Sequence, residues 1–263
     1  MNRAEHQMAV RWLANRGQRV LAPTPFIGAL LATRNAAVGT LWRFLLFMVP
    51  GLAAAFGYQL AFGRALGSRT LYFVYFAMQL AMWSGIRSRQ RRLAKTTHPW
   101  PGATREPWPR VLGGWFTAAV VLAYGGGVVL ALSMAFTTPG RTYGLSLLGL
   151  LGLSALCQAV VLTGFLRAPA LAEEPTSLAV HRALLAENIH VAAPAMVAVP
   201  PIVDTVFAEE PPGYGPLLLA YAAVVIVAEL VAYVRGRRPL PPGHYGDPVP
   251  RGTEVDWSPP EAR

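Results

Sequence analysis

Charged residues are scarce in this chain. Only 14% of its 263 residues are Asp, Glu, Lys or Arg, and 54% are hydrophobic. An ordinary soluble domain has about 25% charged residues, and its surface needs more polar side chains than this chain contains. The same composition excludes disorder for most of the chain. The class that remains is an integral membrane protein, and the sequence alone does not identify its activity.

Lysine and cysteine are each represented by one residue, Lys95 and Cys157. A single cysteine excludes an internal disulfide, and in an apolar run a free thiol packs as a small hydrophobic group. Arginine supplies the other basic residues and brings the formal net charge to +10. A basic excess can indicate nucleic-acid binding. These arginines are instead distributed around apolar segments, so we expect no nucleic-acid partner.

Catalytic motifs are also absent. The sequence has no Gly-x-Ser-x-Gly elbow, no Walker-type phosphate loop, no His-Glu-x-x-His zinc helix and no pair of cysteines. These absences weaken the case for an enzyme, and we expect no cofactor. The one Glu-x-x-His, from Glu187 to His190, is a single copy, whereas di-metal bundles use two copies and further carboxylates. We therefore expect no metal site and interpret the motif as a polar cap where a span begins.

Six apolar segments are each long enough to cross a bilayer, because about 20 helical residues span roughly 30 Å of hydrocarbon. These segments are residues 41–63, 70–86, 111–136, 143–166, 189–207 and 216–234. The fifth contains Pro194, Pro200 and Pro201, and proline removes a backbone donor and kinks a helix. Composition alone leaves open whether residues 189–207 cross the membrane or re-enter it.

The positions of the basic residues favour a full crossing, because Lys and Arg are retained on the cytoplasmic side of the membrane. With six crossings and a cytoplasmic N-terminus, 20 of the 23 basic residues lie on that side. Without a crossing at residues 189–207, the number falls to 15. We expect an all-α fold: a polytopic bundle of six transmembrane helices in the cytoplasmic membrane, with both termini cytoplasmic.

The regions before and after the spans differ from the bundle in composition. Residues 1–39 contain five arginines and no early apolar run, so we expect no cleavable signal peptide. Within them, residues 4–16 predict an amphipathic interfacial helix, and the short apolar stretch 26–32 is expected at the surface. Residues 236–263 are rich in Pro and Gly, which predicts a disordered cytoplasmic tail. The apolar stripe of the interfacial helix consists of Ala4, Met8, Ala9, Trp12 and Leu13.

Five polar residues within the apolar segments are candidates for an intramembrane polar site, since ionisable groups inside a span are costly and often functional. They are Glu229, His190, Gln79, Gln158 and Asp204. In the six-span topology the first four lie in the cytoplasmic half and can converge on one inward-facing cavity. Glutamines also join helices through hydrogen bonds alone. Asp204 lies near the opposite face, so it cannot form a catalytic pair with Glu229.

Basic residues directly follow the second span and form what we call the basic cluster. Its members are Arg87, Arg89, Arg91, Arg92 and Lys95. Such a cluster fixes topology and attracts anionic lipid headgroups by about 1 kcal/mol per charge. It opens a loop, residues 87–110, whose Pro-rich part is expected to be extended and suited to docking a protein partner.

Small residues recur in the third and fourth spans and predict close packing of these two helices. They include Gly114 with Ala118 and Gly127 with Ala131 and Ala135 in the third span, and Gly144, Gly149 and Gly152 in the fourth. The run of three glycines at 125–127 is expected to make the middle of the third span deformable.

These patterns favour a non-enzymatic integral membrane protein that binds a partner protein or lipid at a basic cytoplasmic face. The alternative is a transport protein. One form is the transmembrane subunit of an ATP-driven exporter, which has a similar layout of spans and basic loop. The other form is a proton-coupled carrier of a small solute that uses Glu229. A membrane-embedded enzyme ranks third.

Overall fold

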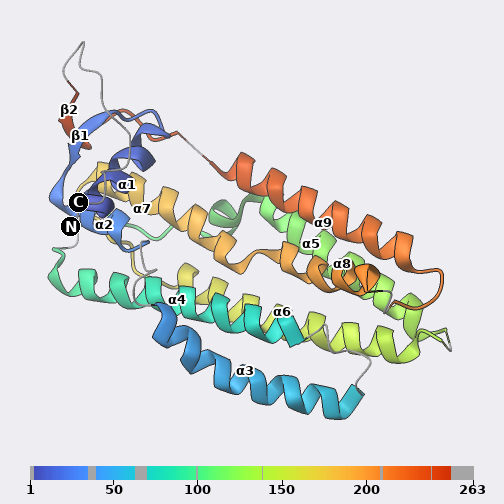
Figure 1. Cartoon of the computed structure of the whole chain (residues 1–263). Helices are drawn as coiled ribbons and strands as arrows, with labels where there is room; N and C mark the ends of the chain where they lie inside the picture. The colour runs from blue at the N-terminus through green and yellow to red at the C-terminus, as the bar shows by residue number, and fades with distance from the viewer. Residues whose placement is uncertain are drawn as a thin grey trace.

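The computed structural model describes residues 3–34, 40–62, 70–98, 100–137, 139–207, 210–237 and 239–249, and it is mostly helical (Figure 1). The α-helices are α1 (Arg3–Ala14), α2 (Pro25–Ala32), α3 (Thr40–Phe62), α4 (Thr70–Thr96), α5 (Trp108–Ala135), α6 (Arg141–Leu166), α7 (Pro175–Asn188), α8 (Val199–Val206) and α9 (Gly215–Gly236). Two short 3-10 helices, η3 (Ile189–Ala192) and η4 (Pro194–Ala198), connect α7 to α8. Two strands, β1 (Val20–Pro23) and β2 (Gly246–Pro248), pair antiparallel.

Four helical segments in the described part of the chain are long and apolar enough to cross a membrane. They are α5, α6, the run from α7 to α8 (Pro175–Val206), and α9. They correspond to the predicted spans 111–136, 143–166, 189–207 and 216–234. In α3 the apolar part is shorter, Phe44–Tyr58, and α4 ends in the basic cluster. The helical, membrane-type fold is confirmed at this level, and the count of six spans stays a prediction.

The segment after the second predicted span is helical, although we expected a loop from residue 87. Helix α4 continues without a break through the basic cluster to Thr96. No Pro or Gly lies between Ile86 and Thr96, and Arg, Gln, Leu, Ala and Lys are good helix formers. The loop therefore begins about ten residues later than predicted, and the basic cluster occupies the end of a long helix.

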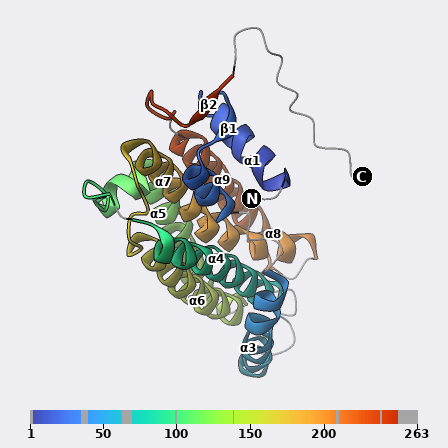
Figure 2. The ribbon, with the colours of Figure 1, turned by 90° about the vertical axis from the view of Figure 1, so that its left-hand side faces the viewer.

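Helices α4, α5, α6 and α9 run side by side, and α3 packs on the outside against α4 (Figures 1 and 2). The close packing predicted for the third and fourth spans is confirmed at Gly144, where a Cβ would collide with the backbone of Ala131 and Ala135. Gly149, by contrast, has no described neighbour within 4 Å of that position. The glycines at 125–127 lie in regular helix. The break in α5 falls instead at Gly113, whose φ is 67°.

Residues 189–198 form a break in the run from α7 to α8. Helix α7 starts at Pro175, upstream of the predicted span, because Pro175 occupies its first turn and Glu174 with Ser177 forms a capping box. The three prolines of the predicted span 189–207 interrupt its helix, as expected. Pro194 opens η4, and Pro200 and Pro201 occupy the first turn of α8, where a missing N–H costs nothing.

Two described segments, residues 3–34 and 239–249, form a cap at one end of the bundle together with the first part of α7 (Figure 1). The cap is composed of α1, β1, α2, β2 and that part of α7. Tyr245 is 1% exposed and packs in the same apolar cluster as Leu13, Ile27 and Leu30. The predicted disordered tail is therefore ordered at least through β2, because β1 supplies it with backbone hydrogen bonds and the cap supplies an apolar site for Tyr245. Its residues from 250 onward lie outside the described part.

Two expectations for the N-terminal region change with this packing. The stretch 26–32 is α2, and its residues Ile27 and Leu30 are fully buried, so it is not a surface segment. Residues 3–14 form the expected helix, but Ala9 and Leu13 of the apolar stripe are buried against other parts of the cap. This half of the stripe cannot contact lipid, and an interfacial position for α1 stays a prediction.

Candidate functional site

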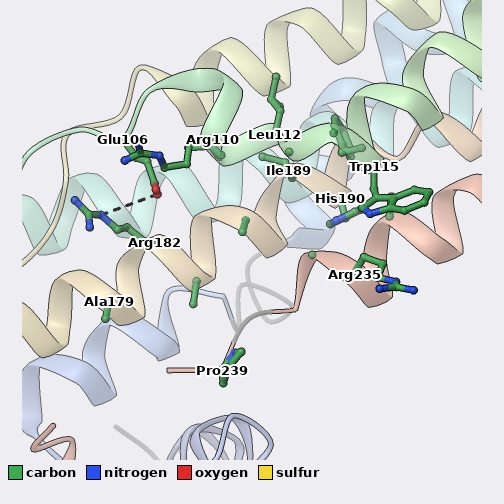
Figure 3. Close-up of a pocket in the computed structure, with 18 of the residues that line it drawn as sticks. Glu106, Arg110, Leu112, Trp115, Ala179, Arg182, Ile189, His190, Arg235 and Pro239 are labelled. Atoms are coloured by element: carbon green, nitrogen blue, oxygen red, sulfur yellow. Dashed lines mark ion pairs between the residues drawn. The ribbon is translucent and has the colours of Figure 1, made fainter. Parts of the chain in front are cut away.

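A pocket of about 360 Å³ lies where the cap meets the bundle (Figure 3). Its walls come from separate parts of the chain: the segment after α1, Glu106 before α5, both sides of the break in α5, α7 with the adjoining η3, the end of α9, and the segment Pro239–Pro241. Its charged and titratable lining residues are Arg16, Arg110, Arg182, Arg235, Glu106 and His190. We call this the basic pocket.

The break at Gly113 gives the basic pocket its shape. A φ of 67° is in the left-handed region, which glycine adopts without a steric cost. The first turn of α5, with Arg110, is thereby turned away from the axis of the rest of the helix. In Figure 3 Arg110 and Glu106 lie at one side of the pocket, and Trp115, beyond the break, lies at the other side near Arg235.

Positive charge predominates in the basic pocket. Among its described lining residues, four arginines face one carboxylate, Glu106. Nε of Arg182 lies 4.0 Å from Oε2 of Glu106 and has no hydrogen-bond partner within the described residues. The guanidinium carbon of Arg235 lies 6.0 Å from the ring centroid of Trp115. These arginines therefore have donors left to bind an anion.

Arg16 is held in place by an ion-pair network behind the pocket. Its guanidinium pairs with Oε1 of Glu187, and Arg34 pairs with Oε2 of the same carboxylate. Nε1 of Trp12 also donates to Glu187 over 3.1 Å. Burial lowers the pKa of Arg34, but a guanidinium stays protonated at neutral pH. Glu187 is thus shared by two arginines and joins α1, the end of α2 and α7.

His190 and Glu229, two of the predicted site residues, form a hydrogen-bonded pair. Nδ1 of His190 lies 2.7 Å from Oε1 of Glu229, and the two side chains are only 11% and 13% exposed. The imidazole also makes edge contacts with the rings of Phe116 and Tyr233. Oε2 of Glu229 is buried without a hydrogen-bond partner among the described residues. His190 lines the basic pocket, so the pair connects α9 to the pocket wall.

The two predicted glutamines bind backbone in the break between α7 and α8. Nε2 of Gln79 donates to the carbonyl of Val191 over 2.9 Å, and Nε2 of Gln158 donates to the carbonyl of Ala192 over 2.7 Å. A broken helix leaves such carbonyls without intrahelical donors. The glutamines supply them, so they join helices next to His190 without lining the basic pocket.

Asp204 lies apart from the other four predicted site residues. It belongs to α8, is 0% exposed, and accepts a 2.6 Å hydrogen bond from the hydroxyl of Tyr143. Its place near the opposite end of the bundle agrees with the sequence-based depth, since Figure 1 shows α8 far from the cap. Its contact with Tyr143 joins α8 to the start of α6.

The basic cluster at the end of α4 is partly used to attach the cap. Arg89 donates to the carbonyl of Ala32 over 2.8 Å and lies 3.9 Å from Glu5. Arg87 donates to Gln90 over 3.3 Å. Arg91, Arg92 and Lys95 are exposed. None of these five residues lines the basic pocket.

The arginines of the basic pocket were not candidates from the sequence, where they counted only toward topology. One local signal was available: Arg110 stands three residues before Gly113-Gly114, and a glycine pair near a span boundary often marks a break or a close approach. Glu187 and His190 of the Glu-x-x-His motif have different partners in the structure. In the described part of the chain, no group of three His, Cys, Asp or Glu side chains is placed to hold a metal ion. Comparison of the chain with protein families, with curated proteins and with solved structures finds no match.

Proposed function

We propose that this protein is a non-enzymatic integral protein of the cytoplasmic membrane that binds a phosphate-bearing anionic group in the basic pocket. One observation carries this proposal: Arg16, Arg110, Arg182 and Arg235 line one pocket of about 360 Å³ with Glu106 as the one carboxylate among its described lining residues. Guanidinium groups match the oxygens of a phosphate with two parallel donors each. An arginine already held by Glu187 costs little further ordering when the anion arrives.

The proposed topology has six spans and both termini in the cytoplasm. The pairing of β1 with β2 supports it, because residues 20–23 and 246–248 must then lie on one side of the membrane. An even number of crossings between them follows. The excess of basic residues near these ends supports a cytoplasmic side, and it places the basic pocket at the cytoplasmic boundary of the bilayer.

Binding of glycerol phosphate to the detergent-purified protein tests the anion site. We expect saturable binding that glycerol alone does not show. The double variant Arg110→Gln/Arg182→Gln should weaken binding by at least about tenfold, since a charge-assisted hydrogen bond contributes about 1.5–3 kcal/mol. The matched control is Arg91→Gln/Arg92→Gln, which removes the same charge from the exposed face of α4. Equal losses in both variants, or no binding to the wild type, would contradict the proposal.

The pair of His190 and Glu229 favours a second candidate, a proton-coupled carrier. A carboxylate in a candidate span, hydrogen-bonded to a histidine that lines a pocket, is an arrangement that can exchange protons with bound solute or water. Proton flux into vesicles that contain the purified protein tests it. Glu229→Gln should abolish the flux, whereas Glu173→Gln, at an exposed carboxylate, should not. The exporter-subunit alternative rests on layout alone.

A further inference from the structure

An apolar groove begins where the basic pocket ends. It lies between α5 and α9, has a volume of about 450 Å³, and is formed on the α9 side by residues such as Ala223, Val227 and Val231. Its α5 side consists of Trp115, Ala118 and Leu122. Trp115 lines both the groove and the basic pocket. Among the described residues that line the groove, none is charged.

The sequence explains why this face is hollow. Alanines at 118, 223 and 228 leave space between the two helices, while Leu122 and Val227 on the same face project further. Trp115 to Leu122 covers about 10 Å of helix, at 1.5 Å per residue. The hollow therefore extends from the level of the basic pocket toward the middle of the bilayer, along two candidate membrane spans.

Building on the anion-binding function proposed above, we propose that the ligand is a membrane phospholipid with an anionic headgroup. Its phosphate binds the arginines of the basic pocket, and the upper part of one acyl chain lies in the groove between α5 and α9. Trp115 separates the two parts, and tryptophan is the side chain typical of the boundary between headgroups and hydrocarbon. The guanidinium of Arg235, 6.0 Å from the Trp115 ring, lies at the same boundary.

Two features favour a phospholipid over a free phosphate: the positive charge of the basic pocket, and the continuity of that pocket with the apolar groove at Trp115. A soluble anion would use the basic pocket and leave the groove without a role. Every lipid-facing helix touches acyl chains, but this hollow ends at a site with four arginines. An amphiphile satisfies both parts in one molecule, and its binding gains from the apolar surface that the groove buries.

The test fills the groove and leaves the basic pocket intact. Val227 is 57% exposed and lines the groove, so Val227→Phe occupies the hollow from the lipid-facing side. The control is Val129→Phe on α5, at a residue that is 70% exposed and does not line the groove. Two readouts are compared: co-purification of long-chain phosphatidylglycerol, counted by native mass spectrometry, and binding of water-soluble glycerol phosphate.

We expect Val227→Phe to bind glycerol phosphate as the wild type does but to retain about tenfold less phosphatidylglycerol. Val129→Phe should match the wild type in both readouts. Equal retention of phosphatidylglycerol by Val227→Phe and wild type would overturn the acyl-chain site and leave the anion site standing. Equal retention of phosphatidylcholine and phosphatidylglycerol by the wild type would also overturn it. Loss of the arginine dependence in the glycerol phosphate assay would instead contradict the proposed function itself.

Discussion

Nδ1 of His190 lies 2.7 Å from Oε1 of Glu229, and this contact joins the break between α7 and α8 to the last third of α9. The two residues are 39 positions apart in the sequence and belong to different elements, η3 and α9. The contact therefore links two elements that line the basic pocket, η3 and α9. Both side chains are nearly buried. If one is removed, the other is left as a buried polar group without its hydrogen-bond partner, which is unfavourable.

The first prediction concerns this pair. His190→Ala should destabilise the protein by about 1–3 kcal/mol, because the buried carboxylate of Glu229 loses its hydrogen-bond donor. Removing both side chains should cost less than the sum of the two single changes. Thermal unfolding in detergent of wild type, the two alanine variants and the double variant gives the coupling. Strictly additive losses would show that the pair contributes no interaction of its own.

Gln158 provides a second prediction. Gln158→Met keeps the size of the side chain but leaves the carbonyl of Ala192 without its 2.7 Å donor. We expect a loss of about 1–3 kcal/mol, the cost of a buried acceptor without a partner. Leu156→Met, at a position on the same helix that is 63% exposed, serves as the control and should be neutral. A stability equal to that of the control would mean that water reaches the carbonyl.

The contact between α5 and α6 provides a third. Gly144→Ala should destabilise the protein by about 1–3 kcal/mol, because the added Cβ collides with backbone that cannot move aside. Gly149→Ala, five residues along the same helix, meets no described atom within 4 Å. There the same change should stabilise by a few tenths to about 1 kcal/mol through helix propensity. Opposite signs in thermal unfolding are the expected result, and equal signs would contradict the packing.

Glu187 provides a fourth. Glu187→Gln removes the charge that Arg16 and Arg34 share and leaves a buried guanidinium without a counter-charge. We expect a loss of about 3–5 kcal/mol, concentrated in the cap. Limited proteolysis should then cut between α1 and α2 before it cuts the bundle. Glu173→Gln, at an exposed carboxylate, is the control. Wild-type resistance to protease in Glu187→Gln would show that the network does not hold the cap.

A topology reporter fused to the C-terminal residue provides the fifth prediction. Six spans and a cytoplasmic N-terminus give a cytoplasmic signal. The strand pair requires the same side for a reporter fused to the N-terminus. Signals on opposite sides would contradict both the strand pair and the topology, and two non-cytoplasmic signals would contradict the proposed orientation alone.

The long helices could be predicted from hydropathy because a continuous apolar run of about 20 residues is typical of a helix that crosses a bilayer. The start of α7 and the end of α4 were missed, although local signals for both are present: a capping box at Glu174 and an unbroken run of helix formers through the basic cluster. Hydropathy does not register such signals, and the packing of Leu93 in the cap adds a contact from distant residues. The burial of Tyr245 could not be predicted from the sequence either. Its neighbours in the sequence are rich in Pro and Gly, and it is buried only because residues of the cap that are distant in the sequence pack around it.

The candidate site could be predicted in part. The cost of burying His190 and Glu229 identified both residues, and the depth along each helix placed them at one level. The pairing of His190 with Glu229 and the role of the glutamines at the break could not be predicted. Both depend on how each helix is rotated about its own axis, and mean hydropathy carries no information about that rotation. Arg110 and Arg235 were missed because a basic residue at the end of a span is expected for topology alone.

The strand pair also sets the order in which the molecule can be completed. Val20 is made early, but its partner Pro248 emerges only after the last helix. Leu240 and its neighbours, which close the basic pocket, arrive at the same late stage. A chain that stalls before this point leaves Leu13 without the packing of Leu240 and Tyr245 in the cap. The basic pocket is therefore complete only in chains in which α9 and the segment after it have already been made.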